Sequence, residues 1–475
     1  MAAFSFYWHD YETFGANPSI DRPSQFAGIR TDGELNIIAE PLEVFCQPAP
    51  DFLPQPMACL ITGITPQHAL ANGVNEAEFM AIVYKELAAP GTCGVGYNSI
   101  RFDDEVTRYG LYRNFYEPYG REWQNGNSRW DLIDVVRLCY ALRPEGINWP
   151  LREDGSPSFK LELLTQANGI EQVGAHDALV DVRATIEFAK LIKKTSSKLF
   201  DYALSLRKKA EVSKCLDVAA RKPVLHVSSK FLAINGCAAL VVPIAMHPRN
   251  SNGVIVIDLA QNPDEWVYLT ADEIRKKLYT PSAEMAEGEN RVGIKTIHIN
   301  KSPMVVTAKA LTEKRAAELG IDLAACRENY LRWKSMEPSV IEKIRDVLDT
   351  EPPERGDVDK MLYSQFLPNS DKSLLQQVRT STPDDLAAGK LPFTDARLPD
   401  LLFRYRARNW PESLSEKEKG FWAEFCHQRI HDTEGGGSIV MIDYLAELAE
   451  LKTKDDLTDK DRNVLDALEE YAKQL

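Results

Sequence analysis

The chain has 475 residues, of which 44% are hydrophobic and 27% charged, and its formal net charge is −14 at pH 7. This length predicts two or three domains with sizeable cores. The acidic balance argues against a protein that coats nucleic acid or a membrane through a broad basic face, although a basic cleft can still exist locally.

Eight cysteines are scattered along the chain without a C-x-x-C pair. This usage is ordinary for a reducing compartment and predicts no zinc site. The N-terminal residues lack the basic and apolar regions of a signal peptide. The longest apolar run, residues 237–246, has about half of the ~20 residues that span a bilayer. We therefore expect a cytoplasmic protein that makes no membrane contact.

The first part of the chain mixes strand and helix patterns. Residues 4–40 predict strands, including a hairpin that turns at Asp32-Gly33. Apolar spacing then predicts a helix at 75–92, a short strand at 93–99, and helices at 129–142, 159–169 and 176–194. This order predicts a mixed α/β domain, which we place at residues 1–196.

The pattern changes after a polar break at residues 193–198. Short strand-like runs with turn signals between them predict a β-rich domain at 197–351. A second break, TEPPERGD at residues 350–357, precedes apolar residues at helical spacing. We therefore expect a helical domain at 352–475.

Two carboxylates, Asp10 and Glu12, end the first strand in the segment FSFYWHDYETFG. Successive side chains of a strand alternate between its faces, so both share a face with Phe4, Phe6 and Trp8. Burying two bare carboxylates side by side is unfavourable because they lose hydration and repel each other. Either this strand end is solvated, as is usual for an isolated D-x-E, or a cation holds the pair.

Two later segments supply further candidates. In GYNSIRFDDEVTR, Asp103 comes where a strand and loop meet a helix start, and Asp104 and Glu105 would complement the helix dipole. In GAHDALVDVRAT, Asp181 lies roughly 120° from the middle of the apolar stripe of its helix, so it can face a cleft. His176 lies before or at the first turn, where a lone histidine is more often structural than catalytic.

The ordered set D-x-E, Asp and H-x4-D resembles the DEDDh branch of the DEDD superfamily of 3′→5′ exonucleases. The likeness to the bacterial exodeoxyribonuclease I family extends over essentially the whole chain, through FYWHDYETFG, GYNSIRFDDEVTR, SRWDLIDVVRLCYALRPEGINWP, HINKSP and LLFRYRARNWP. It implies a nuclease domain of α/β ribonuclease H-like fold, an SH3-like β domain and a helical C-terminal domain, which together enclose single-stranded DNA.

The resemblance implies hydrolysis of single-stranded DNA from its 3′ end to 5′-mononucleotides, in DNA repair and recombination. Carboxylates without cysteine suit two Mg²⁺ ions, with Mn²⁺ as a substitute, and not zinc. Asp10, Glu12, Asp103 and Asp181 would hold the ions, and Glu12 would also touch the substrate. His176 would deprotonate the attacking water.

Arginines and aromatic residues alternate between Arg101 and Arg143. Arginines pair with phosphates and aromatic rings stack on unpaired bases, so the run suits single-stranded DNA, although about half of these aromatics would be core residues. Lys160 stands where the family tends to have arginine. The DNA contacts that the family pattern implies are Arg108, Tyr119, Trp123, Arg137, Lys160, Lys209, Asn252, Lys295, His298 and Asn300.

The resemblance also implies a protein partner, the acidic C-terminal tail of single-stranded DNA-binding protein. Arg143 and Tyr202 match positions associated with that tail, which needs a basic pocket beside an apolar one. The family has a basic residue at the position of Thr312. The detailed pocket for the tail therefore differs from the family pattern at this position. We expect the protein to be a monomer.

Two other functions fit parts of the pattern. A DEDDh exonuclease that acts on RNA, or in proofreading, would share the motifs but is usually little more than the nuclease core. A catalytically silent clamp that binds DNA ends would have no need of all five motif residues. The extra domains and the intact motifs therefore favour the exonuclease that degrades single-stranded DNA.

Overall fold

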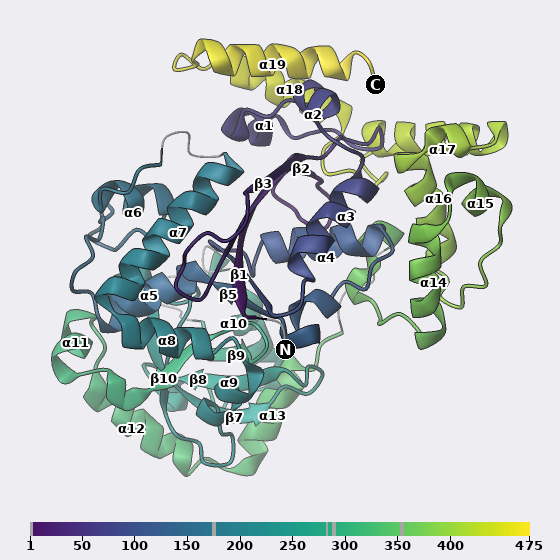
Figure 1. Ribbon diagram of the computed structural model, residues 1–475. Coiled ribbons are helices and arrows are strands. Elements are labelled where there is room, and N and C mark those ends of the chain that lie inside the picture. The colour runs from purple at the N-terminus through teal and green to yellow at the C-terminus, as the bar shows by residue number, and fades with distance from the viewer. Residues whose placement is uncertain (1–2, 173–176, 282–283, 287–290, 352–355) are drawn as a thin grey trace. The chain divides into compact units, whose positions relative to one another are not determined.

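The computed structural model describes residues 3–172, 177–281, 284–286, 291–351 and 356–475 (Figure 1). The chain divides into two compact units. The first consists of residues 1–128, 172–186 and 353–475, and the second of residues 129–171 and 187–352. The first unit therefore combines the N-terminal α/β segment with the C-terminal helices.

The sheet of the first unit is built on β1 (Ser5–Thr13). This strand pairs antiparallel with β2 (Pro23–Thr31) and parallel with β4 (Thr92–Gly96), and β2 pairs antiparallel with β3 (Leu42–Phe45). The strand order is thus β3-β2-β1-β4. The predicted turn at Asp32-Gly33 exists, and beyond it the chain returns to β2 at a bridge between Thr31 and Ile37.

The predicted shared face of β1 is present. The ring centroids of Phe4 and Phe6 are 5.0 Å apart, and those of Phe6 and Trp8 are 5.5 Å apart. The Trp8 indole is fully buried and donates a hydrogen bond to Thr31 Oγ1 at 2.9 Å. This row of rings fixes the strand whose far end carries Asp10 and Glu12.

Helices surround this sheet and form the C-terminal segment. The structure confirms the predicted helical character of that segment. The α-helices of the unit are α1 (Pro56–Thr62), α2 (Pro66–Asn72), α3 (Glu76–Leu87), α4 (Asp103–Arg113), α14 (Asn369–Thr380), α15 (Pro383–Ala388), α16 (Leu398–Asn409), α17 (Glu416–His431), α18 (Met441–Lys452) and α19 (Asp459–Ala472). Its short 3-10 helices are η1 (Gly120–Glu122), η2 (Gln124–Gly126), η7 (Val358–Tyr363) and η8 (Pro411–Ser413).

The C-terminal helices share hydrophobic cores with the N-terminal segment. Figure 1 shows α18 and α19 beside α1 and α2, and the packing of these helices agrees. One buried cluster joins Phe14 and Phe52 to Tyr444, Leu448 and Leu468. The C-terminal helices are therefore an integral part of the first unit.

Buried charges make a second connection within this unit. The guanidinium of Arg408 donates to Asp51 Oδ2 at 2.7 Å and to Asp359 Oδ1 at 2.9 Å. Arg22 lies within 3.9 Å of both carboxylates. Buried charges are tolerated only when they are paired and hydrogen-bonded, so this cluster requires all its members.

The second unit contains an antiparallel sheet in the order β10-β6-β7-β8-β9, which confirms the predicted β structure. Its strands are β6 (Val224–Val227), β7 (Ala238–Met246), β8 (Gly253–Asp258), β9 (Ile294–His298) and β10 (Met304–Thr307). Its helices are α5 (Leu132–Leu142), α6 (Leu161–Ala167), α8 (Ser197–Ser205), α9 (Lys209–Cys215), α10 (Ala271–Tyr279), α11 (Glu313–Glu318), α12 (Leu323–Lys334) and α13 (Pro338–Leu348), with η3 (Ala233–Asn235), η4 (Pro263–Glu265) and η6 (Ala308–Ala310).

Two elements cross the division between the units, namely β5 (Ser128–Asp131) and α7 (Ala178–Thr195). The helix predicted at residues 129–142 begins only at Leu132, because the preceding residues form β5. Asp131 ends that strand and caps the helix, since its side chain accepts the N–H of Ile133 at 3.2 Å. The predicted domain limits at 196 and 351 remain predictions.

Candidate active site

Three carboxylates converge at the end of β1. Asp10 and Glu12 lie on this strand, and Asp181 lies in the first turn of α7. One carboxylate oxygen from each lies within 4.8 Å of the others. The predicted convergence is therefore present for these three side chains, all within the first unit.

The backbone around Glu12 departs from regular pairing. The register of β1 against β2 shifts between Glu12 and Thr13, and Gln25 is the partner of Glu12. The Gln25 side chain donates to Glu43 Oε1 at 2.7 Å and accepts the N–H of Ala178, the first residue of α7, at 3.4 Å. Such bulges re-aim side chains near functional sites. Here Gln25 also ties the strand beside Glu12 to the helix that carries Asp181.

Asp103 is held against the same strand. It is the first residue of α4, it is 3% exposed, and its Oδ1 accepts the N–H of Tyr11 at 3.0 Å. Thr107 Oγ1 donates to the Asp103 carbonyl at 2.8 Å and lies 3.0 Å from the Tyr11 hydroxyl. Asp103 is not a member of the 4.8 Å group among the described residues. It lies beside the group, bonded to the amide between Asp10 and Glu12.

The neighbouring acidic residues of α4 have partners of their own. Asp104 is buried and pairs with Arg121 at 2.6 Å, and Glu105 pairs with Arg108 at 2.8 Å. Both side chains lie in the first turn of α4, where the prediction placed them as complements of the helix dipole. Their direct roles are these ion pairs.

The electrostatics of the cluster fit a bound cation. Burial raises the pKa of Asp10 well above its usual range, and the charges of Asp103, Glu12 and Asp181 raise it further. Burial, followed by the charges of Asp181 and Asp103, raises the pKa of Glu12 to about 8. Like charges so close cannot all ionise unless positive charge compensates them. Because every donor in the group is a carboxylate oxygen, hard divalent ions suit it.

The predicted general base, His176, lies outside the described residues. Its neighbour Asp177 accepts the N–H groups of Leu179 and Val180 at 3.0 and 3.1 Å and so starts α7. Gln172 Nε2 donates to Asp181 Oδ1 at 2.7 Å. Sequence reasoning missed this contact, because a glutamine in a loop carries no signal of its partner.

Arg108, a predicted DNA contact, is surrounded by acidic side chains. Its Nε and Nη2 donate to the two carboxylate oxygens of Glu122 at 2.6 and 2.8 Å, and its Nη1 donates to Glu105 Oε1 at 2.8 Å. The guanidinium also lies 5.4 Å from the ring centroid of Tyr119. In this structure Arg108 therefore orders the surrounding side chains, including a second predicted contact.

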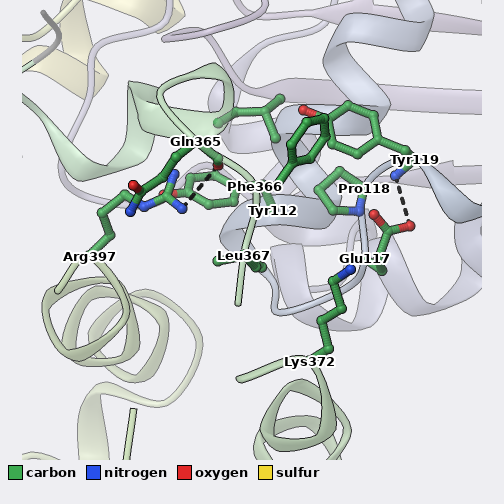
Figure 2. Close-up of a pocket in the computed structure, with 10 residues that line it drawn as sticks. Tyr112, Glu117, Pro118, Tyr119, Gln365, Phe366, Leu367, Lys372 and Arg397 are labelled. Carbon is green, nitrogen blue, oxygen red and sulfur yellow. Dashed lines mark hydrogen bonds between the residues drawn. The ribbon is translucent and has the colours of Figure 1, made fainter. Parts of the chain in front are cut away.

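An exposed aromatic ring, Phe366, lies beside Tyr119. Tyr119, Phe366 and Lys372 line a small cavity of about 30 Å³. Figure 2 shows Tyr119 and Phe366 side by side, with Lys372 further out. Their centroids are 5.9 Å apart, Phe366 is 83% exposed, and Trp123 is 66% exposed. Phe366 was not predicted as a DNA contact, because the run of aromatic and basic residues considered for that role ends at Arg143. Rings with this exposure can stack on bases.

Two predicted contacts of the second unit lie near α5 and α6. Arg137 is buried, donates to Asp134 Oδ1 at 2.6 Å, and lies 5.7 Å from the ring centroid of Phe159. Lys160 is exposed and immediately precedes α6. Lys160 is thus accessible to a ligand, whereas Arg137 has an acidic neighbour on its own helix.

The remaining predicted contacts of this unit lie around β8 and β9. Lys209 Nζ donates to Asn252 Oδ1 at 2.6 Å, and the backbone carbonyl of Asn300 accepts from Arg129 at 3.3 Å. Lys295 and His298 line a cavity of about 550 Å³. The Lys295 ammonium lies 3.2 Å from the ring centroid of Phe231. Burial, Lys301 and His247 lower the pKa of His298 to about 4.

The residues predicted to bind a protein tail also belong to the second unit. Arg143 is exposed, and the Tyr202 hydroxyl donates to the Val305 carbonyl at 2.8 Å. Thr312 caps α11 by accepting the N–H of Arg315 at 3.2 Å. The hydroxyl at this position thus has a structural use that a basic side chain would not provide.

None of the helices within the described part of the chain is both long and apolar enough to span a membrane.

Protein-family models match three successive segments. The Exonuclease model matches residues 7–189, the Exonuclease I SH3-like domain matches 207–350, and the Exonuclease I C-terminal domain matches 356–475. Exodeoxyribonuclease I of Escherichia coli K12 is 48% identical over 427 residues, which are 89% of each chain. The Haemophilus influenzae protein of the same name is 46% identical over 430 residues, 90% of this chain and 91% of the relative.

Solved structures agree with these matches. A moderately thermophilic exonuclease I from Methylocaldum szegediense superimposes with a TM-score of 0.95 at 50% identity, over 99% of each chain. Escherichia coli exonuclease I in complex with a dA16 oligonucleotide gives 0.94 at 45% identity, over 99% of each chain. The zinc-bound form of an E. coli complex with single-stranded DNA gives 0.95 at 44% identity, over 100% of this chain and 99% of the other.

Proposed function

The chain belongs to the exodeoxyribonuclease I family, and on that premise we propose that it degrades single-stranded DNA from the 3′ end and releases 5′-mononucleotides. The observation that carries the proposal is the group of Asp10, Glu12 and Asp181 at the end of β1, with Asp103 bonded to the amide between the first two. The oligonucleotide complexes of the E. coli relative support single-stranded DNA as the substrate.

The family and the donor set support dependence on divalent metal ions. We assign two Mg²⁺ ions to Asp10, Glu12, Asp103 and Asp181, with Mn²⁺ as a substitute. Such ions supply a hydroxide nucleophile at neutral pH and neutralise the charge that develops on the leaving oxygen. The raised pKa values of Asp10 and Glu12 support this assignment, since a cluster of like charges needs a compensating cation.

The chain's own groups would perform the remaining tasks. His176 would accept the proton of the attacking water, and Asp177 would support it by fixing the start of α7. Gln172 and the Tyr11 amide would orient Asp181 and Asp103 through the hydrogen bonds described above. Orienting a charged ligand in advance reduces the reorganisation that the reaction requires.

Exposed rings and basic side chains would bind the DNA strand. Trp123 and Tyr119 would stack on bases of the strand. Arg108, which lies beside the Tyr119 ring and pairs with Glu122, would contact the strand next to them. The further contacts that we propose are Glu12, Arg137, Lys160, Lys209, Asn252, Lys295, His298 and Asn300.

We also propose that the protein is a cytoplasmic monomer that acts in DNA repair and recombination. Arg143 and Tyr202 would bind the acidic C-terminal tail of single-stranded DNA-binding protein. The exposed position of Arg143 supports this assignment, because a tail carboxylate requires an accessible cation. One nitrogen of its guanidinium, Nη1, donates to the Leu142 carbonyl.

The decisive experiment compares Asp181→Asn with wild type on 5′-labelled single-stranded DNA in Mg²⁺. The variant should still bind DNA but should fail to shorten it, because an amide replaces an anionic ligand. Glu187→Gln, an exposed change on the same helix, is the matched control and should digest normally. If Asp181→Asn digests DNA at the wild-type rate, the assignment of Asp181 as a metal ligand is wrong. RNA and duplex DNA of the same sequence should be largely resistant, and faster digestion of RNA would favour the alternative substrate.

A further inference from the structure

Helix α17 has one face fixed against the first unit and one face open to water. Trp422 and Arg429 are buried, and Trp422 lies 5.4 Å from the Phe425 ring. Arg429 Nη1 donates to Asp357 Oδ2 at 2.6 Å. At 100° per residue these side chains lie on one side of the helix, so its backbone is anchored from that side.

Two histidines occupy the opposite face, one turn apart. His427 and His431 are both exposed, and their ring centroids lie 4.5 Å apart with an angle of 38° between the rings. Residues four apart on a helix are surface neighbours. The two imidazole rings therefore lie next to each other on the last turn of α17, where a cation can reach them from water.

Two imidazoles at this spacing form a chelate for one divalent transition metal, as they do in helical zinc motifs. The C-terminal end of a helix carries partial negative charge, which favours a cation there. Glu424 lies one turn earlier on the same face and accepts from Gln428 at 2.7 Å, so it adds negative charge nearby. Each of these features favours a pair of histidines that shares one bound cation over two histidines that act independently.

We propose that His427 and His431 form a second metal site, which takes a transition-metal cation of the class of Zn²⁺, Ni²⁺ or Cu²⁺, with water in the remaining positions. Imidazole nitrogen suits these ions, whereas Mg²⁺ prefers oxygen. The chain thus carries two sites of different selectivity, one of carboxylates and one of imidazoles. Occupancy of the second site stabilises the last turn of α17, because a ligand that binds the folded state favours that state.

The test is calorimetric titration of Ni²⁺ into the full-length protein in excess Mg²⁺, which keeps the carboxylate site occupied. Wild type should bind one Ni²⁺. His427→Ala and His431→Ala should each weaken this binding by about tenfold or more, because a single imidazole lacks the chelate. His68→Ala, another exposed histidine, is the matched control and should bind as wild type does.

A spectroscopic measurement provides a second readout. Electron paramagnetic resonance of bound Cu²⁺ should report two nitrogen ligands in wild type and one in either variant. Nuclease rates in Mg²⁺ should be equal in all four proteins, because α17 contributes nothing to the carboxylate site. The proposal is overturned if wild type binds no Ni²⁺, or if either histidine can be replaced without weakening the binding.

Discussion

The side chain of Asp103 accepts the backbone N–H of Tyr11 at 3.0 Å, and this bond joins the first turn of α4 to the strand between Asp10 and Glu12. A carboxylate at this point has two separable properties, its charge and its ability to accept a hydrogen bond. Substitutions that remove one property or both therefore distinguish a metal ligand from a structural group.

The first prediction concerns Asp103→Asn. The asparagine oxygen can still accept the Tyr11 N–H, so the thermal midpoint should stay near that of wild type. Nuclease activity should fall by about 100-fold or more, as when an electrostatic group is removed from an active site. Asp103→Leu should also lose about 1.5–3 kcal/mol of stability, because it leaves a buried N–H without an acceptor. Equal activity in wild type and Asp103→Asn would show that the charge has no catalytic role.

The second prediction concerns Gln172, whose amide donates to Asp181. Gln172→Ala should raise the Mg²⁺ concentration needed for half-maximal activity by about 10–100-fold, the usual effect of losing a partner that orients a metal ligand. The rate at saturating Mg²⁺ should change less. Gln166→Ala, at an exposed position of α6, is the control. An unchanged Mg²⁺ dependence would leave Gln172 with no positioning role.

The third prediction concerns the exposed ring of Trp123. Trp123→Ala should weaken binding of single-stranded DNA by about 1–3 kcal/mol, the value of one stacked base. Its stability should stay within about 0.5 kcal/mol of wild type, because the side chain is largely in water. Tyr268→Ala removes an aromatic ring that is 84% exposed and should leave DNA binding unchanged. Fluorescence anisotropy with a labelled oligonucleotide measures both variants.

The fourth prediction concerns the buried charges around Arg408. Arg408→Met should reduce the free energy of unfolding by about 3–5 kcal/mol, because Asp51 and Asp359 keep their burial but lose a partner. Arg345→Met removes an exposed pair with Glu342 and should cost about 1 kcal/mol or less. Urea unfolding measures the stability of both variants. Equal losses of stability would contradict the expectation that the buried charge matters more than the exposed one.

The fifth prediction concerns acid. Burial alone would raise the pKa of Asp51, but the guanidinium groups of Arg408, Arg22 and Arg429 hold it well below its usual range. A depressed carboxyl pKa contributes stability above the unfolded value of about 3.9, and that contribution is lost as the pH falls further. The urea midpoint of wild type should therefore fall from about pH 5 downward. Asp51→Asn should be less stable at pH 7 and should show a flatter decline.

The carboxylate group follows from patterns that are local in the sequence. Alternation along β1 places Asp10 with Glu12, and the helical repeat turns Asp181 away from the buried side of α7. Contacts between side chains that are far apart in the sequence produce no local pattern of this kind. The predicted DNA contact of Arg108 stays a prediction, but nothing in the sequence indicated that Arg108 donates twice to Glu122, which lies fourteen positions further along. The sequence supplies residue types, and folding decides which of them meet.

The start of α5 was predicted three residues too early for a different reason. Helical spacing marked residues 129–142, but four residues of strand are too short to show their own alternation, and the change to helix occurs directly at Asp131. Phe366 was missed for a third reason, since an exposed aromatic residue far along the chain is unremarkable until the fold places it beside Tyr119.

The hydrophobic cluster that unites Phe14 with Leu468 has a consequence for biosynthesis. Translation proceeds from the N-terminus, so the ribosome must make residues 444–468 before this cluster can close. Until then a nascent chain would hold Asp10 and Glu12, two of the proposed metal ligands, in an incompletely packed unit. We therefore expect nuclease activity to appear only after the C-terminal helices have been translated.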